Sequence, residues 1–263
     1  MKLLTLNCHS WLEENQLEKI KSIAEAIKEK QYDVIALQEV SQKIEGDISY
    51  GIVKNDNFAL VLQRELNKIE EDSYSFIWDY SHIGYDIYEE GVAIITRHKI
   101  KDSKSFYISK SNDKTNYRSR NIVSVTVEID GEEIDFYSCH AGWWNDEIEP
   151  FKYQADELFK KINNEKLSFI MGDFNNNAYV RNEGYDYLLS KGLKDTYNLS
   201  TTCDDGITVK GAIAGWEDQR ENKRLDLILV NKEINVIESK VIFNGINKGV
   251  VSDHYGVEVV IGK

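Results

Sequence analysis

Three short runs of apolar residues constrain the fold of this chain more than any other feature of its sequence. They are KLLTL at 2–6, VIAL at 34–37 and LSFIM at 167–171. Each run has the length of a strand, and none shows the strict alternation of apolar and polar residues that marks a strand with one wet face. We expect buried strands inside a layered α/β fold, with the second strand ended by Gln38 and Glu39.

Helical periodicity appears between these strands. Asn15 is expected to cap a helix, with Glu18 three residues later as its capping-box partner. Apolar residues at helical spacing carry this helix through Ile27. A second helix is expected over 57–70, and a third begins near Pro150, where a missing N–H group does no harm.

Further strands fill most of the remaining chain. Residues 74–142 contain the runs SFIWDY, GVAIIT, NIVSVTVEI and EIDFYSCH, and Asp130-Gly131 is a strong hairpin-turn signal between the last two. The runs RLDLILV, INVIESKVIF and YGVEVVI follow near the end. Two groups of strands, with helices between and outside them, predict two packed sheets whose outer faces are covered by helices.

Composition limits the class of protein. The 263 residues include one proline and no linker rich in Gly or Ser, so we expect a single domain over 1–263. The formal net charge of −13 disfavours nucleic acid and anionic lipid as partners. The start MKLLTLNCHSW is too polar for a secretion signal, no run approaches the roughly 20 residues of a membrane span, and the three cysteines lack CxxC spacing. We therefore expect a soluble cytoplasmic protein without a membrane partner, of undetermined oligomeric state.

Polar residues follow several of the buried strands at the points where those strands end. Strand ends in α/β sheets are where ligands bind, because rigid strands direct side chains into a common crevice. Carboxylate and amide oxygens suit Mg²⁺, or Mn²⁺, better than zinc. Together with imidazoles they can support phosphoester hydrolysis assisted by a metal ion. The collected residues are Asn7, Glu39, His140, Asp173, Asn175, Asp226, Asp253 and His254.

Six short motifs occur in order across the chain: LNxx, LQE, an SxH strand, GDFN, RxDxI and SDH. Their order and spacing closely resemble the endonuclease/exonuclease/phosphatase superfamily, which includes deoxyribonuclease I, apurinic endonucleases, sphingomyelinases and inositol-phosphate phosphatases. The resemblance implies a four-layer α/β sandwich, in which two packed mixed sheets are flanked by helices. It also implies a phosphoesterase that depends on a divalent metal ion, with Mg²⁺ expected.

The resemblance assigns the metal ligands. Glu39 in LQE corresponds to the principal Mg²⁺ ligand, assisted by Asn7, and Asp253 in SDH is expected to contact the metal directly or through water. One position departs from the pattern of some nucleases, which carry an acid two residues after the first Asn. His9 stands there in this chain, so a role in binding a second metal does not carry over.

The resemblance also assigns catalytic roles. Asp173 in GDFN would position or deprotonate the attacking water, and Asn175 would donate to the phosphate. His254 would stabilise the transition state, oriented by Asp226. His140 matches the strand histidine that contacts phosphate in the nuclease and sphingomyelinase branches. From the sequence alone, Asp226 could instead form an ordinary ion pair with the nearby Arg224.

The stretch FIMGDFNNNA places its polar residues directly after an apolar run. We expect Gly172 to let the chain turn tightly, so that Asp173 and Asn175 face the crevice. Asn176 and Asn177 are expected to support the loop.

Several further segments bear on the substrate. LNCHSWLEENQ, HIGYDIYEEGVAI, SCHAGWW, GDFNNNA and AGWE resemble the bacterial subgroup of this superfamily that includes maltose 6′-phosphate phosphatase. This resemblance implies a small phosphorylated sugar as the substrate. Arginine matches a phosphate dianion, and aromatic faces pack on sugar rings. The expected substrate-binding residues are Arg120, Arg118, Trp143, Trp216 and Tyr85.

Other activities of the superfamily stay open at this point. One is a diester-cleaving nuclease of the deoxyribonuclease I or apurinic type, which the net charge disfavours. Another is a phosphodiesterase like the sphingomyelinases, with Trp143 and Trp144 at a membrane. A binding module without catalysis would lack site residues, and none of the collected set is missing.

Overall fold

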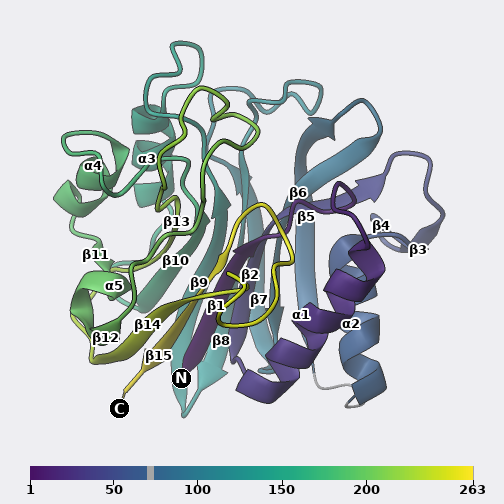
Figure 1. Cartoon of the computed structure of the whole chain (residues 1–263), viewed down its shortest axis with the longest axis horizontal. Helices are drawn as coiled ribbons and strands as arrows, with labels where there is room; N and C mark the ends of the chain where they lie inside the picture. Colours follow the sequence, from purple (N-terminus) through teal and green to yellow (C-terminus); the bar gives the residue numbers. More distant parts are fainter. Residues whose placement is uncertain (70–73, 263) are drawn as a thin grey trace.

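The computed structural model describes residues 1–69 and 74–262, and two β-sheets form its centre (Figure 1). The first sheet has seven strands in the order β12 (Ser200–Cys203), β14 (Val236–Ile242), β15 (Gly256–Ile261), β1 (Lys2–Asn7), β2 (Val34–Lys43), β6 (Tyr88–Thr96) and β5 (Ser75–Gly84). The second has six, in the order β11 (Lys194–Asp195), β13 (Asp226–Val230), β10 (Leu167–Asp173), β9 (Glu132–His140), β8 (Asn121–Ile129) and β7 (Ile100–Tyr107). A separate hairpin pairs β3 (Ile48–Tyr50) with β4 (Val53–Lys54).

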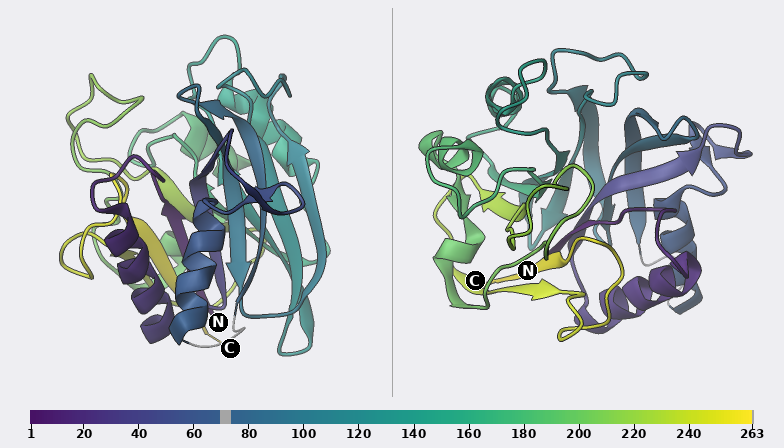
Figure 2. Two further views of the ribbon diagram at one scale, coloured as in Figure 1. Left: turned by 90° about the vertical axis from the view of Figure 1, so that its right-hand side faces the viewer. Right: turned by 45° about the horizontal axis from the view of Figure 1, so that its top comes forward.

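Helices cover the outer face of each sheet, which confirms the expected four-layer sandwich. The five helices of the described chain are α1 (Gln16–Lys30), α2 (Phe58–Ile69), α3 (Phe151–Phe159), α4 (Gly184–Ser190) and α5 (Thr196–Leu199). The left view of Figure 2 shows α1 and α2 side by side on the first sheet, and Figure 1 shows α3 and α4 on the other side of the molecule. Within 1–69 and 74–262, no helix has the length and apolar character to cross a membrane.

The apolar strands are buried on both faces because each contributes to two cores. In β1, Leu3 packs between the sheets, whereas Leu4 packs under the helices of the first sheet. In β10, Met171 packs between the sheets and Ile170 lies under the helices of the second sheet. Side chains alternate between the faces of a strand. A strand between two apolar layers must therefore be apolar at nearly every position, as the sequence indicates.

The structure corrects three details of the expected elements. Asn15 does precede α1, but it adopts a left-handed conformation and its side chain makes no capping hydrogen bond. Strand β2 does not end at Gln38 and Glu39, because it continues to Lys43 beyond an irregularity. The strand β7 was not expected, since its residues are polar and exposed at a sheet edge. The expected hairpin at Asp130-Gly131 is confirmed, while residue 70 of the expected second helix lies outside the described residues.

Asp33 joins three strands at the edge of the first sheet opposite the strand ends described below. Its carboxylate accepts the Lys2 backbone N–H at 2.7 Å, the Arg97 guanidinium at 2.6 Å and lies 2.8 Å from Nε2 of His98. Burial alone would raise the pKa of Asp33, but the bonds from His98, Lys2 and Arg97 lower it below its usual value. His98 therefore belongs to this structural cluster.

We predict that Asp33→Asn lowers the free energy of unfolding at pH 7 by about 1–3 kcal/mol, since hydrogen bonds to a charged group are lost. A carboxyl with a depressed pKa in the fold stabilises the protein above its unfolded pKa and loses this effect as pH falls through the folded value. Urea unfolding across pH 3–7 measures the difference, which should shrink toward acid pH. Asp47→Asn, at an exposed position, is the matched control. A pH-independent difference would contradict the prediction.

Candidate active site

Three neighbouring strands of the second sheet bring three of the expected residues to the same level. Asp173 at the end of β10 is paired in register with His140 on parallel β9 and with Asp226 on antiparallel β13. Met171 points between the sheets, and residues two apart share a face, so Asp173 also points between the sheets. The site therefore lies at the open end of the inter-sheet layer.

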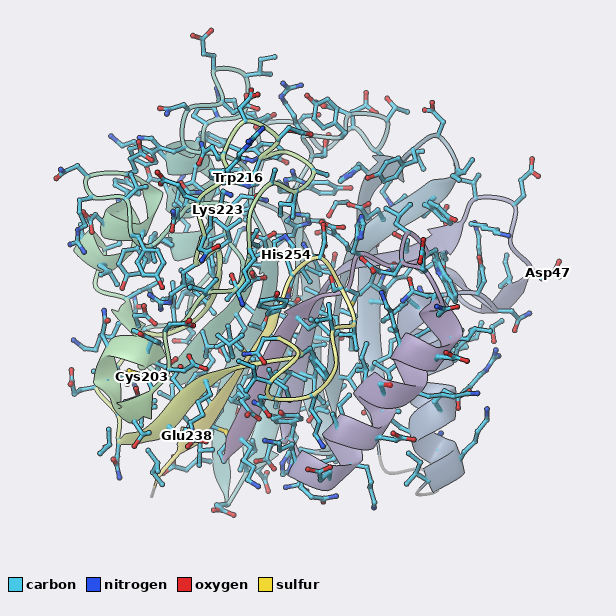
Figure 3. The ribbon with its side chains drawn as sticks, in the orientation of Figure 1. Asp47, Cys203, Trp216, Lys223, Glu238 and His254 are labelled. Atoms are coloured by element: carbon cyan, nitrogen blue, oxygen red, sulfur yellow. The ribbon has the colours of Figure 1, made fainter. Side chains whose placement is uncertain are left out.

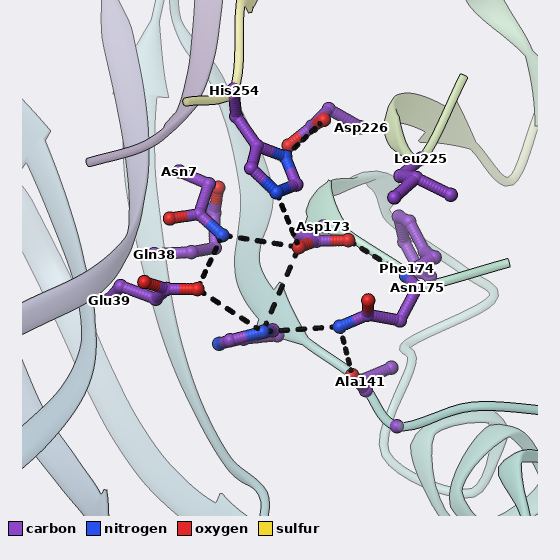
Figure 4. A network of polar contacts seen from close by, with 12 residues as sticks. Asn7, Gln38, Glu39, Ala141, Asp173, Phe174, Asn175, Leu225, Asp226 and His254 are labelled. Carbon is purple, nitrogen blue, oxygen red and sulfur yellow. Dashed lines mark hydrogen bonds and ion pairs between the residues drawn. The ribbon is translucent and has the colours of Figure 1, made fainter. Parts of the chain in front are cut away.

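Asn7 joins the two sheets at this level. Its amide nitrogen donates to Oε1 of Glu39 at 2.8 Å in the first sheet and to Oδ2 of Asp173 at 3.1 Å in the second (Figure 4). One step deeper, Nε2 of Gln38 donates to Oγ of Ser138 at 3.1 Å. Polar side chains thus replace the apolar ones as the inter-sheet layer approaches its end.

Glu39 reaches the site because β2 is irregular there. The register with β6 shifts between Leu37 and Val40, and Glu39 has φ of 51°. In a regular strand, Gln38 and Glu39 would point to opposite faces. A bulge residue in the left-handed region redirects its side chain, and such bulges are frequent beside active sites. Here the carboxylate of Glu39 is turned toward Asn7.

A buried chain of polar contacts, called the relay below, runs from Asp226 through His254 to Asp173. Nδ1 of His254 lies 2.9 Å from Oδ2 of Asp226, and its Nε2 lies 3.8 Å from Oδ2 of Asp173. Burial alone would lower the pKa of His254, but the carboxylates of Asp226 and Asp173 raise it well above its usual value. This shift of the pKa favours the imidazolium form of the ring. Arg224 pairs with Asp195 instead of Asp226.

The electrostatic environment of Asp173 suits a proton acceptor. Burial raises the pKa of its carboxyl to about 6, the imidazolium of His254 opposes this rise, and Asp226 adds to it. A pKa just below neutrality leaves the carboxylate ionised while keeping it basic enough to take a proton. His140, by contrast, is held neutral, because burial and the nearby charge of Arg120 lower its pKa well below the usual range.

The turn after β10 positions Asn175. Its backbone N–H donates to Oδ1 of Asp173 at 2.8 Å, and its side-chain amide nitrogen donates to the carbonyl of Ala141 at 3.0 Å. The left-handed residue of this turn is Asn175, with φ of 48°. Gly172 lies inside the strand and does not form the turn. Glycine is required there because a Cβ atom would lie 1.9 Å from the carbonyl oxygen of Cys139.

A pocket of about 290 Å³ opens over this network. Of the expected catalytic and metal-binding residues, Glu39, His140, Asp173, Asn175 and His254 line it, together with Arg120, Trp143 and Tyr85. Asn7 and Asp226 lie behind these side chains, hydrogen-bonded to them. Asp253 is a quarter exposed and lies 3.7 Å from His9 through its Oδ1.

Two expected substrate-binding residues have other partners. Nε of Arg118 donates to Oδ2 of Asp146 at 2.7 Å, and the guanidinium lies over the ring of Tyr117, outside the pocket lining. The indole N–H of Trp216 donates to Oδ1 of Asn175 at 3.0 Å. Trp216 is thus directed at the polar network of the candidate site, whereas Tyr117 lines the pocket in place of Arg118.

Sequence reasoning missed Glu90. This buried carboxylate on β6 lines the pocket with His82, and their side chains approach to 3.4 Å. Burial raises the pKa of Glu90, but His82 and Arg120 lower it below its usual value, so it stays ionised. The available signal was an acidic pair, Glu89-Glu90, at the start of a strand that is otherwise apolar.

The donor set fits a hard divalent cation. Burial raises the pKa of Glu39 to about 8, and the carboxylates of Glu90 and Asp253 add to the rise. Negative charge is therefore in excess around Glu39, and a bound cation would relieve it. The compact group Asp173, Asp226 and His254 has suitable spacing for a metal. Nδ1 of His254 is already bonded to Asp226, and the raised pKa favours the protonated ring, which has no lone pair for a metal.

Comparison with known proteins identifies the family. The sequence profile of the endonuclease/exonuclease/phosphatase family matches residues 5–254. The chain belongs to this family. The structure of an endonuclease/exonuclease/phosphatase family protein from Leptotrichia buccalis C-1013-b is 46% identical to it, with a TM-score of 0.94 over 100% of both chains. A search of curated protein sequences gave no match.

More distant structures of the endonuclease/exonuclease/phosphatase family share the fold. The mannosyl-6-phosphatase Bt3783 from Bacteroides thetaiotaomicron VPI-5482 is 17% identical, with a TM-score of 0.73 over 100% of both chains. Truncated TDP2 from Caenorhabditis elegans is 15% identical, with a TM-score of 0.64 over 100% of this chain and 97% of its own. Members of this family are metal-dependent phosphoesterases, so the chain is assigned to that broad class of enzyme.

We predict that Glu39→Gln stabilises the metal-free protein at pH 7 by on the order of 3 kcal/mol, because the cost of burying an ionisable group with a raised pKa disappears. The sign follows from the shift: an acid whose folded pKa is raised destabilises the fold as pH rises above its unfolded value. Thermal melts in EDTA from pH 4 to 8 should show the gain growing with pH.

The same variant tests the metal site. Mg²⁺ added to the wild type should raise its melting temperature, since a ligand that binds only the folded state stabilises it. Glu39→Gln should lose most of this rise. An equal rise in both proteins would contradict the assignment of Glu39 as the principal ligand.

Proposed function

We propose that this chain, as a single catalytic domain over 1–263, is a Mg²⁺-dependent phosphatase that hydrolyses a small phosphorylated sugar. The observation that carries the proposal is that Arg120, in the pocket wall, is buried without a hydrogen-bond partner for its Nε. Its side chain is 4% exposed. Within the described chain, no ion pair engages its guanidinium, which lies 5.8 Å from the ring centre of Trp143.

A buried guanidinium without an anionic partner is costly to maintain in the absence of a ligand. Burial lowers the pKa of Arg120, and the carboxylates of Glu90, Asp173 and Glu39 only partly offset this effect from a distance. Its terminal nitrogens can form paired bonds to two oxygens of a phosphate. A terminal phosphate carries more charge than a diester and offers three oxygens, so this residue favours a phosphomonoester.

Glu39 would hold the metal ion, with Asn7 and Asp253 in support. A divalent cation at this position supplies neutralisation of the phosphate charge and polarisation of the P–O bond. Mg²⁺ suits the oxygen ligands, and Mn²⁺ is the alternative.

The remaining residues would accept the proton of the attacking water and stabilise the negative charge that develops on the phosphate. The carboxylate of Asp173 orients the attacking water and accepts its proton. The imidazolium of His254 donates to a phosphoryl oxygen as negative charge develops, while Asp226 fixes the ring at 2.9 Å. Nε2 of neutral His140 accepts from Nδ2 of Asn175 at 3.2 Å. Asn175 would donate to another phosphoryl oxygen, with His140 contacting the phosphate beside it.

The pocket supports a small substrate. A volume of about 290 Å³ lies at the lower end of the range of small-molecule sites. Trp143 and the exposed ring of Tyr85 provide aromatic faces for a sugar. The mannosyl-6-phosphatase Bt3783 shows that this fold serves an enzyme of that kind. We propose a phosphorylated disaccharide such as maltose 6′-phosphate, and the net charge of −13 argues against nucleic acid.

Phosphate release by the purified protein with Mg²⁺ tests the proposal. Maltose 6′-phosphate, trehalose 6-phosphate, glucose 6-phosphate and a nucleotide are compared, with plasmid nicking in parallel. We expect rapid release from a disaccharide phosphate and intact plasmid. Asp173→Ala and His254→Ala should each lower kcat by about 10³-fold or more, which excludes a contaminating phosphatase. Nicked plasmid without phosphate release would place the enzyme among the nucleases.

We predict that Arg120→Lys lowers kcat/KM for the phosphomonoester by about 100-fold, because lysine cannot form the paired bonds. Hydrolysis of bis(p-nitrophenyl) phosphate, a diester, should fall much less. Arg118→Lys is the matched control, since its guanidinium bonds Asp146 outside the pocket. Equal losses in the two variants, or equal losses on the two substrates, would refute the role of Arg120.

A further inference from the structure

A long loop between β12 and β13 covers part of the pocket. Ala214 and Gly215 of this loop belong to the pocket lining, and Gly215 packs so closely on Trp143 that a Cβ atom would lie 2.8 Å from its ring. The next residue, Trp216, donates its indole N–H to Asn175. Figure 3 shows Trp216, Lys223 and His254 in the same part of the molecule.

Lys223 holds this loop together from inside. Its side chain is fully buried, and its ammonium donates to three backbone carbonyls, of Gly211 and Gln219 at 2.8 Å and of Glu221 at 2.9 Å. The ammonium also lies 5.6 Å from the ring centre of Trp216. A buried ammonium is tolerated only when its donors are satisfied. The backbone of residues 211–221 is therefore arranged around the ammonium of Lys223. Trp216 belongs to this segment.

The indole of Trp216 fixes one end of the Asn175 amide. Oδ1 of Asn175 accepts the indole N–H at 3.0 Å, while Nδ2 donates to Ala141 at 3.0 Å. The two ends of an amide differ only in their hydrogen-bonding, so a partner at each end determines which way it points. With Oδ1 engaged, Nδ2 and its second hydrogen face His140 and the pocket.

We propose that Trp216 and Lys223 are positioning residues for the hydrolysis. Trp216 holds the amide of Asn175 with its N–H group toward the phosphoryl oxygen, and Lys223 holds the loop that carries Trp216. The catalytic part of this inference rests on the proposed function, since it assigns Asn175 to the phosphate. The hydrogen bond and its dependence on Lys223 do not rest on it. This role takes the place of the sugar contact expected for Trp216 from the sequence.

A double-mutant cycle tests the coupling. Trp216→Phe keeps an aromatic ring, smaller than the indole, and removes the N–H, and we expect kcat to fall about 10-fold with KM nearly unchanged. In the Asn175→Ala background the same substitution should change kcat less than about 2-fold, because its target is gone. Independent, multiplicative losses would overturn the proposal.

A second measurement is independent of turnover. In the ¹H–¹⁵N spectrum, the indole signal of Trp216 is identified by its loss in Trp216→Phe, and its exchange with solvent is followed. We expect Asn175→Ala to shift this signal and to speed its exchange. Lys223→Met should speed the exchange as well, whereas Lys210→Met, an exposed lysine of the same loop, should not. The proposal would be overturned if Asn175→Ala neither shifts the indole signal nor changes its exchange rate. Equal effects of Lys223→Met and Lys210→Met on the exchange rate would overturn it as well. If these spectral changes are found but the wild-type protein releases no phosphate, the proposed function is refuted. The positioning of Asn175 by Trp216 would then still stand.

Discussion

The register between β9 and β10 is the constraint on which the site depends. It places Asp173 opposite His140, and the pairing of β10 with β13 places Asp226 at the same level. Gly172 makes this close approach possible, because any side chain there would collide with Cys139. One residue of slip would turn Asp173 toward the helices and away from the first sheet. The geometry of the candidate site is thus set by backbone pairing.

The candidate site concentrates negative charge, which bears on the ligands it can bind and on the stability of the fold. Glu39, Glu90 and Asp173 all line one pocket, and the cationic groups that face them are Arg120 and His254. Like charges at close range raise one another's pKa values, and a metal ion or phosphate changes that balance. The apolar cores on either side supply the stability that allows such a cluster to persist.

Much of this arrangement could be predicted from the sequence, because strand ends and short motifs carry it. Asp173 and His140 followed buried strands, and their positions could be inferred from that fact alone. The orientation of the Glu39 side chain could not be predicted in this way. The pattern of residues in a strand gives no sign of a bulge with positive φ. Arg118 and Arg120 lie two residues apart in the same polar segment, and the sequence separates their roles only slightly, with a solvated strand edge favoured more for Arg118. Their difference arises from Asp146, which a distant loop brings to one of them.

The participation of residues from both ends of the chain has a consequence for biosynthesis. Asn7 follows β1, His254 precedes β15, and these two strands are neighbours in the first sheet. The relay to Asp226 therefore forms only when the last strand has docked beside the first. The proposed hydrolysis is accordingly expected to appear only after β15 has paired with β1.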